Sequence, residues 1–405
     1  MLFARNDKVG MAAAALLETL VRQGRSFGIH LLLGSQSLAG LDALGSHVPQ
    51  LLPTRILLPA TEADARRVLG EGNDAGQFLT KHGEGVLNTA GGAVEANQRF
   101  RGAFTDESER RARVARMRSE ADRVGFIRRP VVFEGNAATP IESLAPAAFR
   151  EEMTATGRAP LRIRVGSPMT LSGVADIQLA RDPGANVLVV AREAEDDSVP
   201  RSLVAVAAAS LALSPATIDL VDFTSIDDGL DVVLGPLLER GRLRSHRRRG
   251  LSRVLGELRA QVKDRIETDD VAAPARVLFL YGVDRARDLD TGGVDGDPDL
   301  VDALEEIVRD GPEVGVHVWA WCETVAGLSR RLPGSVVREF AWRVAGRQSP
   351  DDSQRMLGND EASELRDRQV LLVNDDRGMS RRCTTYTVPG SAWLADVLAE
   401  GSEQP

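Results

Sequence analysis

Lysine is almost absent from this chain of 405 residues. Only Lys8, Lys81 and Lys263 occur, although lysine and arginine together number 50. None of the three follows a glycine or precedes a serine or threonine. The chain therefore lacks the Gly-Lys-Ser/Thr sequence of a phosphate-binding loop, in which the lysine neutralises the phosphates of a bound nucleotide.

Other features are also scarce. The two cysteines, Cys322 and Cys383, are too few for a disulfide framework or a cysteine metal cluster, and they favour a reducing cytoplasm. The sequence shows no signal peptide and no apolar run long enough to cross a membrane, so we expect no membrane segment. A net charge of -9 opposes a general attraction to nucleic acid but allows a local basic channel. The length and the 43% hydrophobic content are typical of a globular protein with two domains.

The chain contains an internal repeat. Its first element, GRSFGIHLLL at residues 24–33, matches GPEVGVHVWA at residues 311–320. Further matches follow in the same order: Ala-Gly-Leu at 39–41 and 326–328, DARRVLG at 64–70 with DSQRMLG at 352–358, and apolar runs that end in Asn88 and Asn374. The period is far too long for a solenoid, so the repeat indicates a duplicated domain.

Hydrophobic patterning predicts alternating helices and strands. Continuous apolar runs flanked by glycine or polar residues are typical of strands buried on both faces. Strands are expected at residues 29–33, 55–58, 185–191, 217–223, 276–281 and 316–321, with a small β subdomain beginning at 161–165. Helices are expected at residues 7–23, from 61, and at 106–124, 201–213 and 248–266. Such alternation implies crossover connections and a mostly parallel sheet.

The two copies have unequal lengths. We expect a partial module at residues 1–124, a linker at 125–160 that is marked by prolines and turn residues, and a complete second module at 161–405.

The ordered motifs resemble the FtsK/SpoIIIE family of RecA-like motor ATPases. The run GRSFGIHLLLGSQS at residues 24–37 is similar to a family strand that ends in a polar Gln beside the nucleotide phosphates. The run VLFLYGVDRARDL at residues 277–289 resembles the acidic strand of an altered second module in multi-ATPase relatives. The resemblance implies an α/β fold of RecA-like, P-loop-type parallel sheets flanked by helices. That fold would be duplicated, with one module truncated and the other complete but lacking the phosphate-binding (Walker A) loop.

The resemblance also implies candidate site residues. Gln36 would sense the γ-phosphate, or serve only as a polar residue at a strand end. Arg25 and Arg55 would reach a neighbouring subunit's nucleotide, or lie in solvent as most arginines do. Asp284 follows the acidic strand without a second carboxylate beside it, which indicates a vestigial acidic site. His30 and His317 recur in register inside apolar runs, which favours packed core residues over catalytic ones.

Both modules depart from the family at the nucleotide. The resemblance implies ATP and Mg²⁺ as cofactors, but the loop that would bind them is not in this chain. In module two, the segment after the strand at 186–190 reads AREAEDDS, without glycine and with four carboxylates that would repel a triphosphate. Arg192 or Arg201 would be the only replacement for the lysine there. In module one, the loop and the acidic pair would lie upstream of Met1.

Two functions follow from these observations. The first, which the resemblance implies, is the C-terminal part of an ATP-dependent DNA translocase, a ring-forming homo-oligomer that acts on double-stranded DNA together with an upstream ATPase half. In that case the present chain would be inactive alone. The second is a non-hydrolysing docking module, as in type VII secretion ATPases, with a protein substrate or partner.

Arg247, Arg248 and Arg249 form a basic cluster that would contact a polyanion or lie in solvent. No aromatic residues interleave with it for base stacking. The acidic segment at 288–299 lacks the ligand spacing of a calcium loop, and no metal site is expected.

Overall fold

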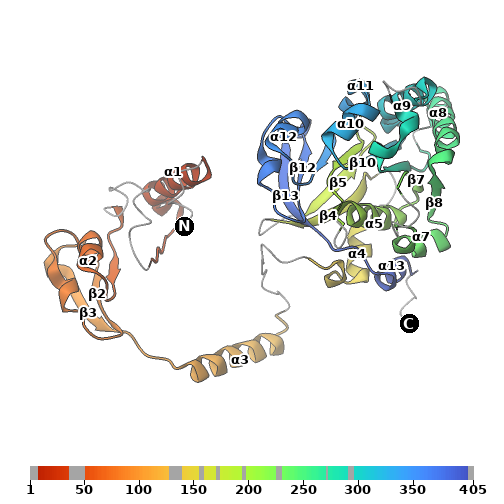
Figure 1. Ribbon diagram of the computed structural model, residues 1–405. Coiled ribbons are helices and arrows are strands. Elements are labelled where there is room, and N and C mark those ends of the chain that lie inside the picture. The colour runs from red at the N-terminus through yellow and green to blue at the C-terminus, as the bar shows by residue number, and fades with distance from the viewer. Residues whose placement is uncertain are drawn as a thin grey trace. The chain divides into compact units, whose positions relative to one another are not determined.

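The computed structural model describes residues 8–35, 51–126, 139–154, 159–169, 174–193, 198–224, 230–270, 272–290 and 296–399. The chain divides into two compact units, unit 1 at Met1–Arg129 and unit 2 at Pro130–Pro405, which are shown in Figure 1. Among the helices of these described ranges, none is both long and apolar enough to cross a membrane.

Unit 1 combines helices with a small antiparallel sheet of order β1-β2-β3. The elements are α1 (Lys8–Gln23), η2 (Gly24–Phe27), β1 (Arg55–Leu57), α2 (Glu62–Leu69), η5 (Asp74–Phe78), β2 (Glu84–Asn88), η6 (Val94–Ala96), β3 (Asn97–Arg101) and α3 (Glu107–Arg123). Thr61 caps α2 by accepting the N–H of Asp64, as its sequence predicts. Leu57, Leu69 and Val86 form a small core between α2 and the sheet.

The strand predicted at residues 29–33 is not formed. These residues have no regular secondary structure, and Leu32 is exposed to solvent. A parallel strand requires neighbours for its hydrogen bonds, and the described strands of unit 1 pair only with one another. The apolar run is a local property of the sequence, whereas strand formation depends on partners that are distant in sequence.

Unit 2 is built on a ten-stranded sheet of order β5-β4-β13-β12-β11-β6-β10-β9-β7-β8. Its strands are β4 (Leu161–Pro168), β5 (Ala175–Leu179), β6 (Val187–Val190), β7 (Thr217–Asp222), β8 (Leu243–Arg247), β9 (Arg276–Tyr281), β10 (Val316–Cys322), β11 (Trp342–Ala345), β12 (Gln369–Asn374) and β13 (Met379–Thr385). Neighbours from β11 to β8 are parallel, and those from β11 to β5 are antiparallel.

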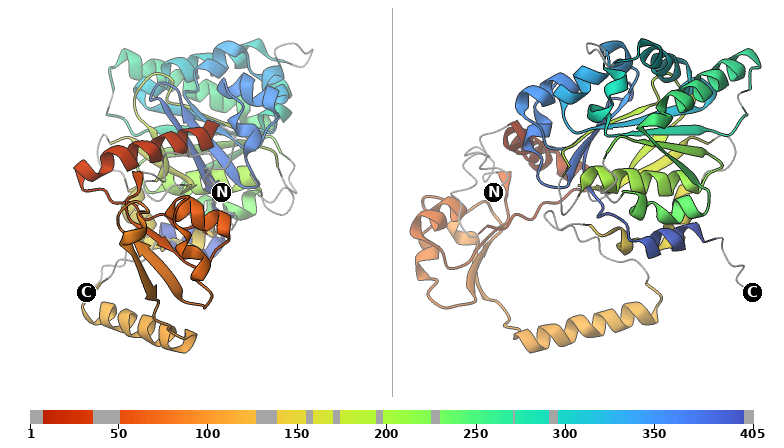
Figure 2. Two further views of the ribbon diagram at one scale, coloured as in Figure 1. Left: turned by 90° about the vertical axis from the view of Figure 1, so that its left-hand side faces the viewer. Right: turned by 45° about the vertical axis from the view of Figure 1, so that its right-hand side comes forward.

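Helices cover both faces of this sheet, which confirms the predicted α/β fold (Figure 2). One face packs against α8 (Leu251–Glu267), α9 (Pro298–Asp310), α10 (Val325–Arg331), α11 (Gly334–Arg338) and α12 (Pro350–Leu357). The other face packs against α5 (Val199–Ala212), α6 (Leu230–Val233) and α7 (Gly235–Glu239). Strands β6, β9 and β10 are fully buried between the two layers, as their continuous apolar runs predict.

The residues ahead of β6 belong to unit 2. Within the expected linker, η7 (Ile141–Ser143) and α4 (Pro146–Met153) pack with α13 (Ser391–Leu398) in a third apolar cluster. There the rings of Phe149 and Trp393 lie 5.1 Å apart, edge to face. The expectation of a separate β subdomain from residue 161 is wrong, because β4 pairs with β13 and so extends the main sheet. That pairing joins segments far apart in sequence and leaves no local signal.

The repeat in the sequence is also a repeat in the structure. Each unit contains three antiparallel strands, β1-β2-β3 or β11-β12-β13. In each, a capped helix and a short 3₁₀ segment lie between the first and the second strand in the sequence. In each unit the long helix α1 or α9 runs into a 3₁₀ segment, η2 or η12 (Pro312–Val314). Both segments end in a left-handed glycine, Gly28 with φ 71° and Gly315 with φ 76°. The duplicated fold predicted from the sequence is confirmed, with unit 1 as the shorter copy.

Candidate functional site

The candidate site lies in unit 2, at the carboxyl ends of the parallel strands β6, β9, β10 and β11. Ligands of open α/β sheets bind at this edge, where the chain leaves neighbouring strands in opposite directions. Strand β6 leads through residues 191–193 to Ser198, which caps α5 by accepting the N–H of Arg201 at 3.0 Å. Residues 194–197 lie outside the described part of the chain. This strand-to-helix connection is the place of a phosphate-binding loop.

A carboxylate occupies the neighbourhood where a phosphate loop would place its lysine. Glu193 forms an ion pair with Arg201 at 3.3 Å and accepts a hydrogen bond from the Tyr281 hydroxyl at 3.5 Å. Burial raises the pKa of Tyr281, and the Glu193 carboxylate raises it further, so the phenol stays protonated and can donate. The guanidinium that could replace the missing lysine is therefore engaged with a carboxylate of the chain itself.

The backbone at the end of β6 is also covered. The indole N–H of Trp321 donates to the Ala191 carbonyl at 2.9 Å, and the Gln348 amide donates to the Val190 carbonyl at 3.3 Å. Tyr281 and Trp321 stack above this point with ring centroids 4.3 Å apart. Bulky side chains thus lie where a glycine-rich loop would wrap around phosphate.

Asp284, the candidate vestigial acidic residue, lies in η10 (Val283–Arg285) just after β9. Its carboxylate accepts the backbone N–H of Glu323 at 3.3 Å, and its carbonyl accepts a hydrogen bond from Arg331 at 3.1 Å. The start of α10 lies directly on it: a Cβ placed on Gly327 would stand 2.8 Å from the Asp284 Cβ. The carboxylate joins the end of β9 to the end of β10.

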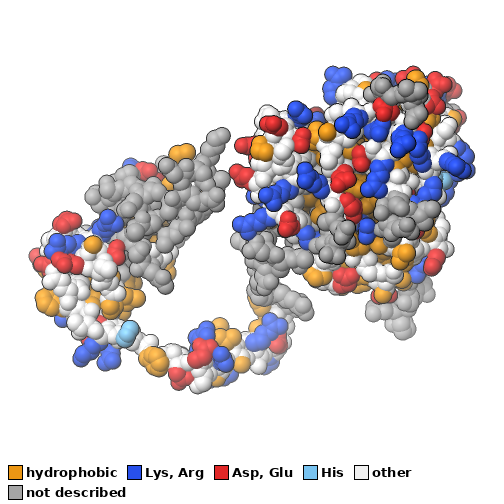
Figure 3. Space-filling view, viewed as in Figure 1, with side chains coloured by type: hydrophobic (Ala, Val, Ile, Leu, Met, Phe, Trp, Pro, Cys, Tyr) orange, Lys and Arg blue, Asp and Glu red, His pale blue; other side chains and the backbone are white. Residues whose placement is uncertain are grey.

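Of the arginines between residues 240 and 253, Arg244, Arg247 and Arg248 form ion pairs with carboxylates, whereas Arg242 donates to the backbone carbonyls of Ala212 and Ser214. Buried Asp219 binds Arg244 at 2.8 Å and Arg276 at 2.9 Å, and this charge-assisted bonding lowers its pKa against the opposing effect of burial. Arg247 bridges Asp222 and Asp231. Basic and acidic side chains are interspersed over the face of unit 2 that Figure 3 shows.

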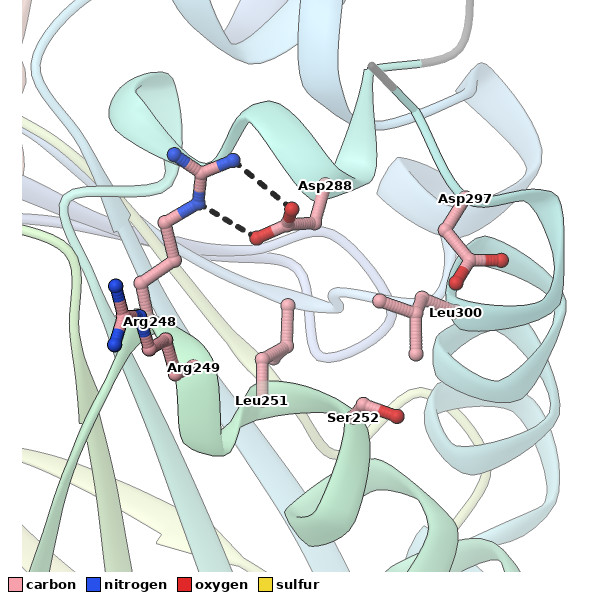
Figure 4. Close-up of a pocket in the computed structure, with 7 residues that line it drawn as sticks. All are labelled: Arg248, Arg249, Leu251, Ser252, Asp288, Asp297 and Leu300. Atoms are coloured by element: carbon pink, nitrogen blue, oxygen red, sulfur yellow. Dashed lines mark hydrogen bonds and ion pairs between the residues drawn. The ribbon is translucent and has the colours of Figure 1, made fainter.

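Arg248 and Arg249 border a shallow groove of about 420 Å³ between α8 and α9 (Figure 4). Arg248 forms a two-pronged ion pair with Asp288, at 2.7 and 2.9 Å, across the mouth of the groove. Leu251 and Leu300 make its floor, whereas the Arg249 side chain points away from it. The groove is open and apolar at its base, and the charges of Arg248 and Asp288 at its mouth neutralise each other.

Comparison with solved structures identifies the architecture. The cytoplasmic domain of the type VII secretion ATPase EccC from Thermomonospora curvata superposes with a TM-score of 0.61 at 17% identity, over 96% of this chain and 48% of that one. The EccC ATPases 2 and 3 in complex with a signal sequence peptide give a TM-score of 0.54 at 16% identity, over 96% and 67%. The fold is that of a RecA-like P-loop ATPase. The chain spans less than half of the EccC cytoplasmic domain. No family model and no curated protein matches the sequence.

Unit 1 holds the other predicted site residues. Gln36 lies outside the described residues. Arg25 is exposed in η2, and Arg55 is half-buried in β1 with its guanidinium directed to the carbonyls of Leu52 and Val68, both at 3.1 Å. Burial lowers the pKa of Arg55. In this conformation Arg55 fastens β1 to the loop before it and to the end of α2.

His30 and His317 have opposite environments despite their shared position in the repeat. His30 is exposed, whereas His317 is fully buried in β10 and donates from Nδ1 to the Ala185 carbonyl at 2.8 Å. Burial lowers the pKa of His317 to about 4, so the ring is neutral at physiological pH. Its contacts are those of a structural core residue.

Sequence reasoning missed the residues that close the site. Gly327 belongs to the repeated Ala-Gly-Leu triplet, and that recurrence was the available signal for a close backbone approach. Glu193 was visible as one of four carboxylates, but its pairing with Arg201 and Tyr281 was not. Among the described residues, no group of three or more His, Cys, Asp or Glu is placed to hold a metal ion.

Proposed function

We propose that unit 2 is a non-hydrolysing docking module of a multi-module motor ATPase, of the kind used in type VII secretion. The observation that carries this proposal is the engagement of Arg201 by Glu193 in the connection that leads to α5. A triphosphate would have to break the ion pair between Arg201 and Glu193, and it would then be repelled by the Glu193 carboxylate. Because the chain has no phosphate-loop lysine, no cation of that kind compensates for this repulsion. ATP and Mg²⁺ bound elsewhere in a full assembly are compatible with this role.

The choice of a secretion ATPase over a DNA translocase is supported by two considerations. Two solved structures that share this fold over 96% of the chain are of EccC, a type VII secretion ATPase, and one of them holds a signal sequence peptide. Three of the arginines that would grip DNA phosphates, Arg244, Arg247 and Arg248, are instead paired with Asp219, Asp222 and Asp288. Binding to a polyanion would require these ion pairs to break. We therefore propose a protein as the substrate or partner.

The test measures ATP binding by the stability of unit 2. All four tryptophans lie in this unit, so their fluorescence reports its unfolding in urea. We expect about 1 mM MgATP to change the free energy of unfolding by less than about 0.3 kcal/mol, because a ligand at a hundred times its Kd would add about 2.7 kcal/mol. Steady-state phosphate release should also stay at background.

Two variants locate any effect that is found. Arg201→Ala removes the guanidinium that is paired with Glu193, and Arg309→Ala removes an exposed guanidinium at the far end of α9 as a matched control. Stabilisation by MgATP that persists in the Arg309 variant and disappears in the Arg201 variant would place a nucleotide in unit 2. That result would contradict the proposed function.

A further inference from the structure

Unit 1 exposes apolar residues whose counterparts in unit 2 are buried. The repeat aligns Ile29 with Val316 and Leu32 with Trp319. Val316 is 0% exposed and Trp319 is 2% exposed, whereas Ile29 is 44% exposed and Leu32 is 92% exposed. Residues of the same position and the same apolar character thus have opposite environments. Among the described residues of unit 1, nothing buries Ile29 and Leu32 as neighbouring strands and helices bury Val316 and Trp319 in unit 2.

Unit 2 shows what the cover consists of. Strand β10, the counterpart of residues 29–33, pairs in parallel with β6 on one side and with β9 on the other. Trp319 packs against Phe279 of β9 with ring centroids 5.6 Å apart. The cover is therefore a pair of apolar parallel strands with the helix layers that follow them.

The edge of β1 indicates that unit 1 lacks a strand in the position that β6 has in unit 2. In unit 2, β11 lies between β12 and β6 and pairs with both. In unit 1 its counterpart β1 pairs with β2 and stands at the edge of the sheet. Ile56 and Leu58, in and beside β1, are both exposed. One inserted strand in the place of β6 would pair with β1 and with residues 29–33 at once.

Helix α1 packs against residues 29–33 as its counterpart α9 packs against β10. Leu31 packs against Leu17 of α1, as Val318 and Leu304 join one apolar cluster in unit 2. Residues 29–33 are thus already held on α1 in the manner of β10 on α9. The uncovered surface consists of the outer edge of β1, the extended residues 29–33 and the side chain of Leu32.

We propose that residues 29–33 and β1 form a docking surface for a polypeptide segment that supplies the front half of a RecA-like module. That segment would insert one apolar strand between residues 29–33 and β1, and would place a second on the outer side of residues 29–33. The partner is a polypeptide because the edge of β1 and the extended backbone after Ile29 offer N–H and C=O groups with which a further strand would pair. This inference rests on the duplication and does not depend on the proposed role of unit 2.

A second copy of this chain fits the surface less well. Its unit 1 offers only the same back half, and the front half of its unit 2 already lies within its own sheet between β11 and β8. A second copy of this chain is therefore the less suitable partner.

The first measurement is amide hydrogen exchange on the chain as it is. We expect amides at residues 30–33 to exchange within about tenfold of the rate of an unstructured chain, whereas those at 316–320 are protected at the level of global unfolding. Protection of residues 30–33 in the dilute chain would overturn the proposal. Protection that appears only at higher concentration, together with a doubled mass in light scattering, would assign the surface to a second copy and would also overturn it.

The second measurement supplies a front half as the probe. In this extended chain, a copy of residues 184–296 is joined directly to Gly10. The junction lies there because the repeat aligns Gly10 with Asp297, the residue that follows this segment in unit 2. We expect exchange at residues 29–33 and in β1 to slow by at least about 100-fold in the extended chain. Leu32→Asp should abolish this protection, and Val94→Asp, an exposed apolar residue of η6, should not. Unprotected amides in the extended chain would refute the docking surface.

Discussion

A single buried imidazole makes the stability of unit 2 depend on pH. His317 keeps a pKa of about 4 in the folded chain, below its ordinary value of 6.5, because burial and the nearby Arg181 and Arg265 disfavour its charged form. Below pH 6.5 the unfolded chain therefore binds a proton that the folded chain does not. The resulting contribution to stability is present above pH 6.5 and is lost as the pH falls towards 4.

We expect the free energy of unfolding of unit 2 to fall by up to about 3 kcal/mol between pH 6.5 and 4 because of this residue. His317→Gln keeps an N–H donor for the Ala185 carbonyl but does not titrate. Urea unfolding followed by tryptophan fluorescence should therefore give two curves that differ by a constant amount above pH 6.5. Below that pH the two curves should converge. A constant difference across the whole range would contradict this assignment.

At the scale of elements, the contact between α10 and the end of β9 depends on a missing side chain. Gly327 allows α10 to lie on Asp284, and an alanine Cβ there would stand 2.8 Å from the Asp284 Cβ and 3.1 Å from the Thr324 hydroxyl. We expect Gly327→Ala to lower the stability of unit 2 by about 1–3 kcal/mol through overpacking.

Gly334→Ala is the matched control for this change. Gly334 is also helical, at the start of α11, and a Cβ there meets nothing within 4 Å. Its substitution should leave stability unchanged or raise it by about 0.5–1 kcal/mol, since alanine favours helix. Equal destabilisation by both alanines in urea titrations would mean that α10 does not pack on Asp284 as described.

Elements with a local signature were predictable from the sequence, and elements defined by distant partners were not. The strands at 276–281 and 316–321 are continuous apolar runs, and both form. The run at 29–33 carries the same signature but lacks flanking strands, while β8 is polar and exists because it pairs with β7. The missing phosphate loop could be read directly from the sequence. The closure over Asp284 could not, because Gly327 approaches it from another element.

At the scale of the whole molecule, the two units have separate cores. Leu69 of α2 and Leu304 of α9 are both fully buried leucines on helices, the first in the core of unit 1 and the second in that of unit 2. Each leucine-to-alanine substitution should cost about 2–5 kcal/mol in its own core.

Tryptophan fluorescence reports only unit 2, so Leu304→Ala should shift the fluorescence transition in urea and Leu69→Ala should leave it unchanged. Far-ultraviolet circular dichroism, which detects the helices of both units, should register both substitutions. A shift of the fluorescence transition by Leu69→Ala would show that the cores unfold as one cooperative unit.

The place of β13 in the large sheet also constrains how the protein is made. Strand β4 pairs with β13, which is synthesised roughly 200 residues later. A ribosome therefore releases β4 and its neighbour β5 long before β13 exists, and the edge of β4 that pairs with β13 stays unpaired while the parallel strands are produced. Such long-range pairing slows folding and prolongs the time in which unpaired edges can aggregate. Chaperone demand during translation should accordingly be concentrated on the earliest strands of unit 2.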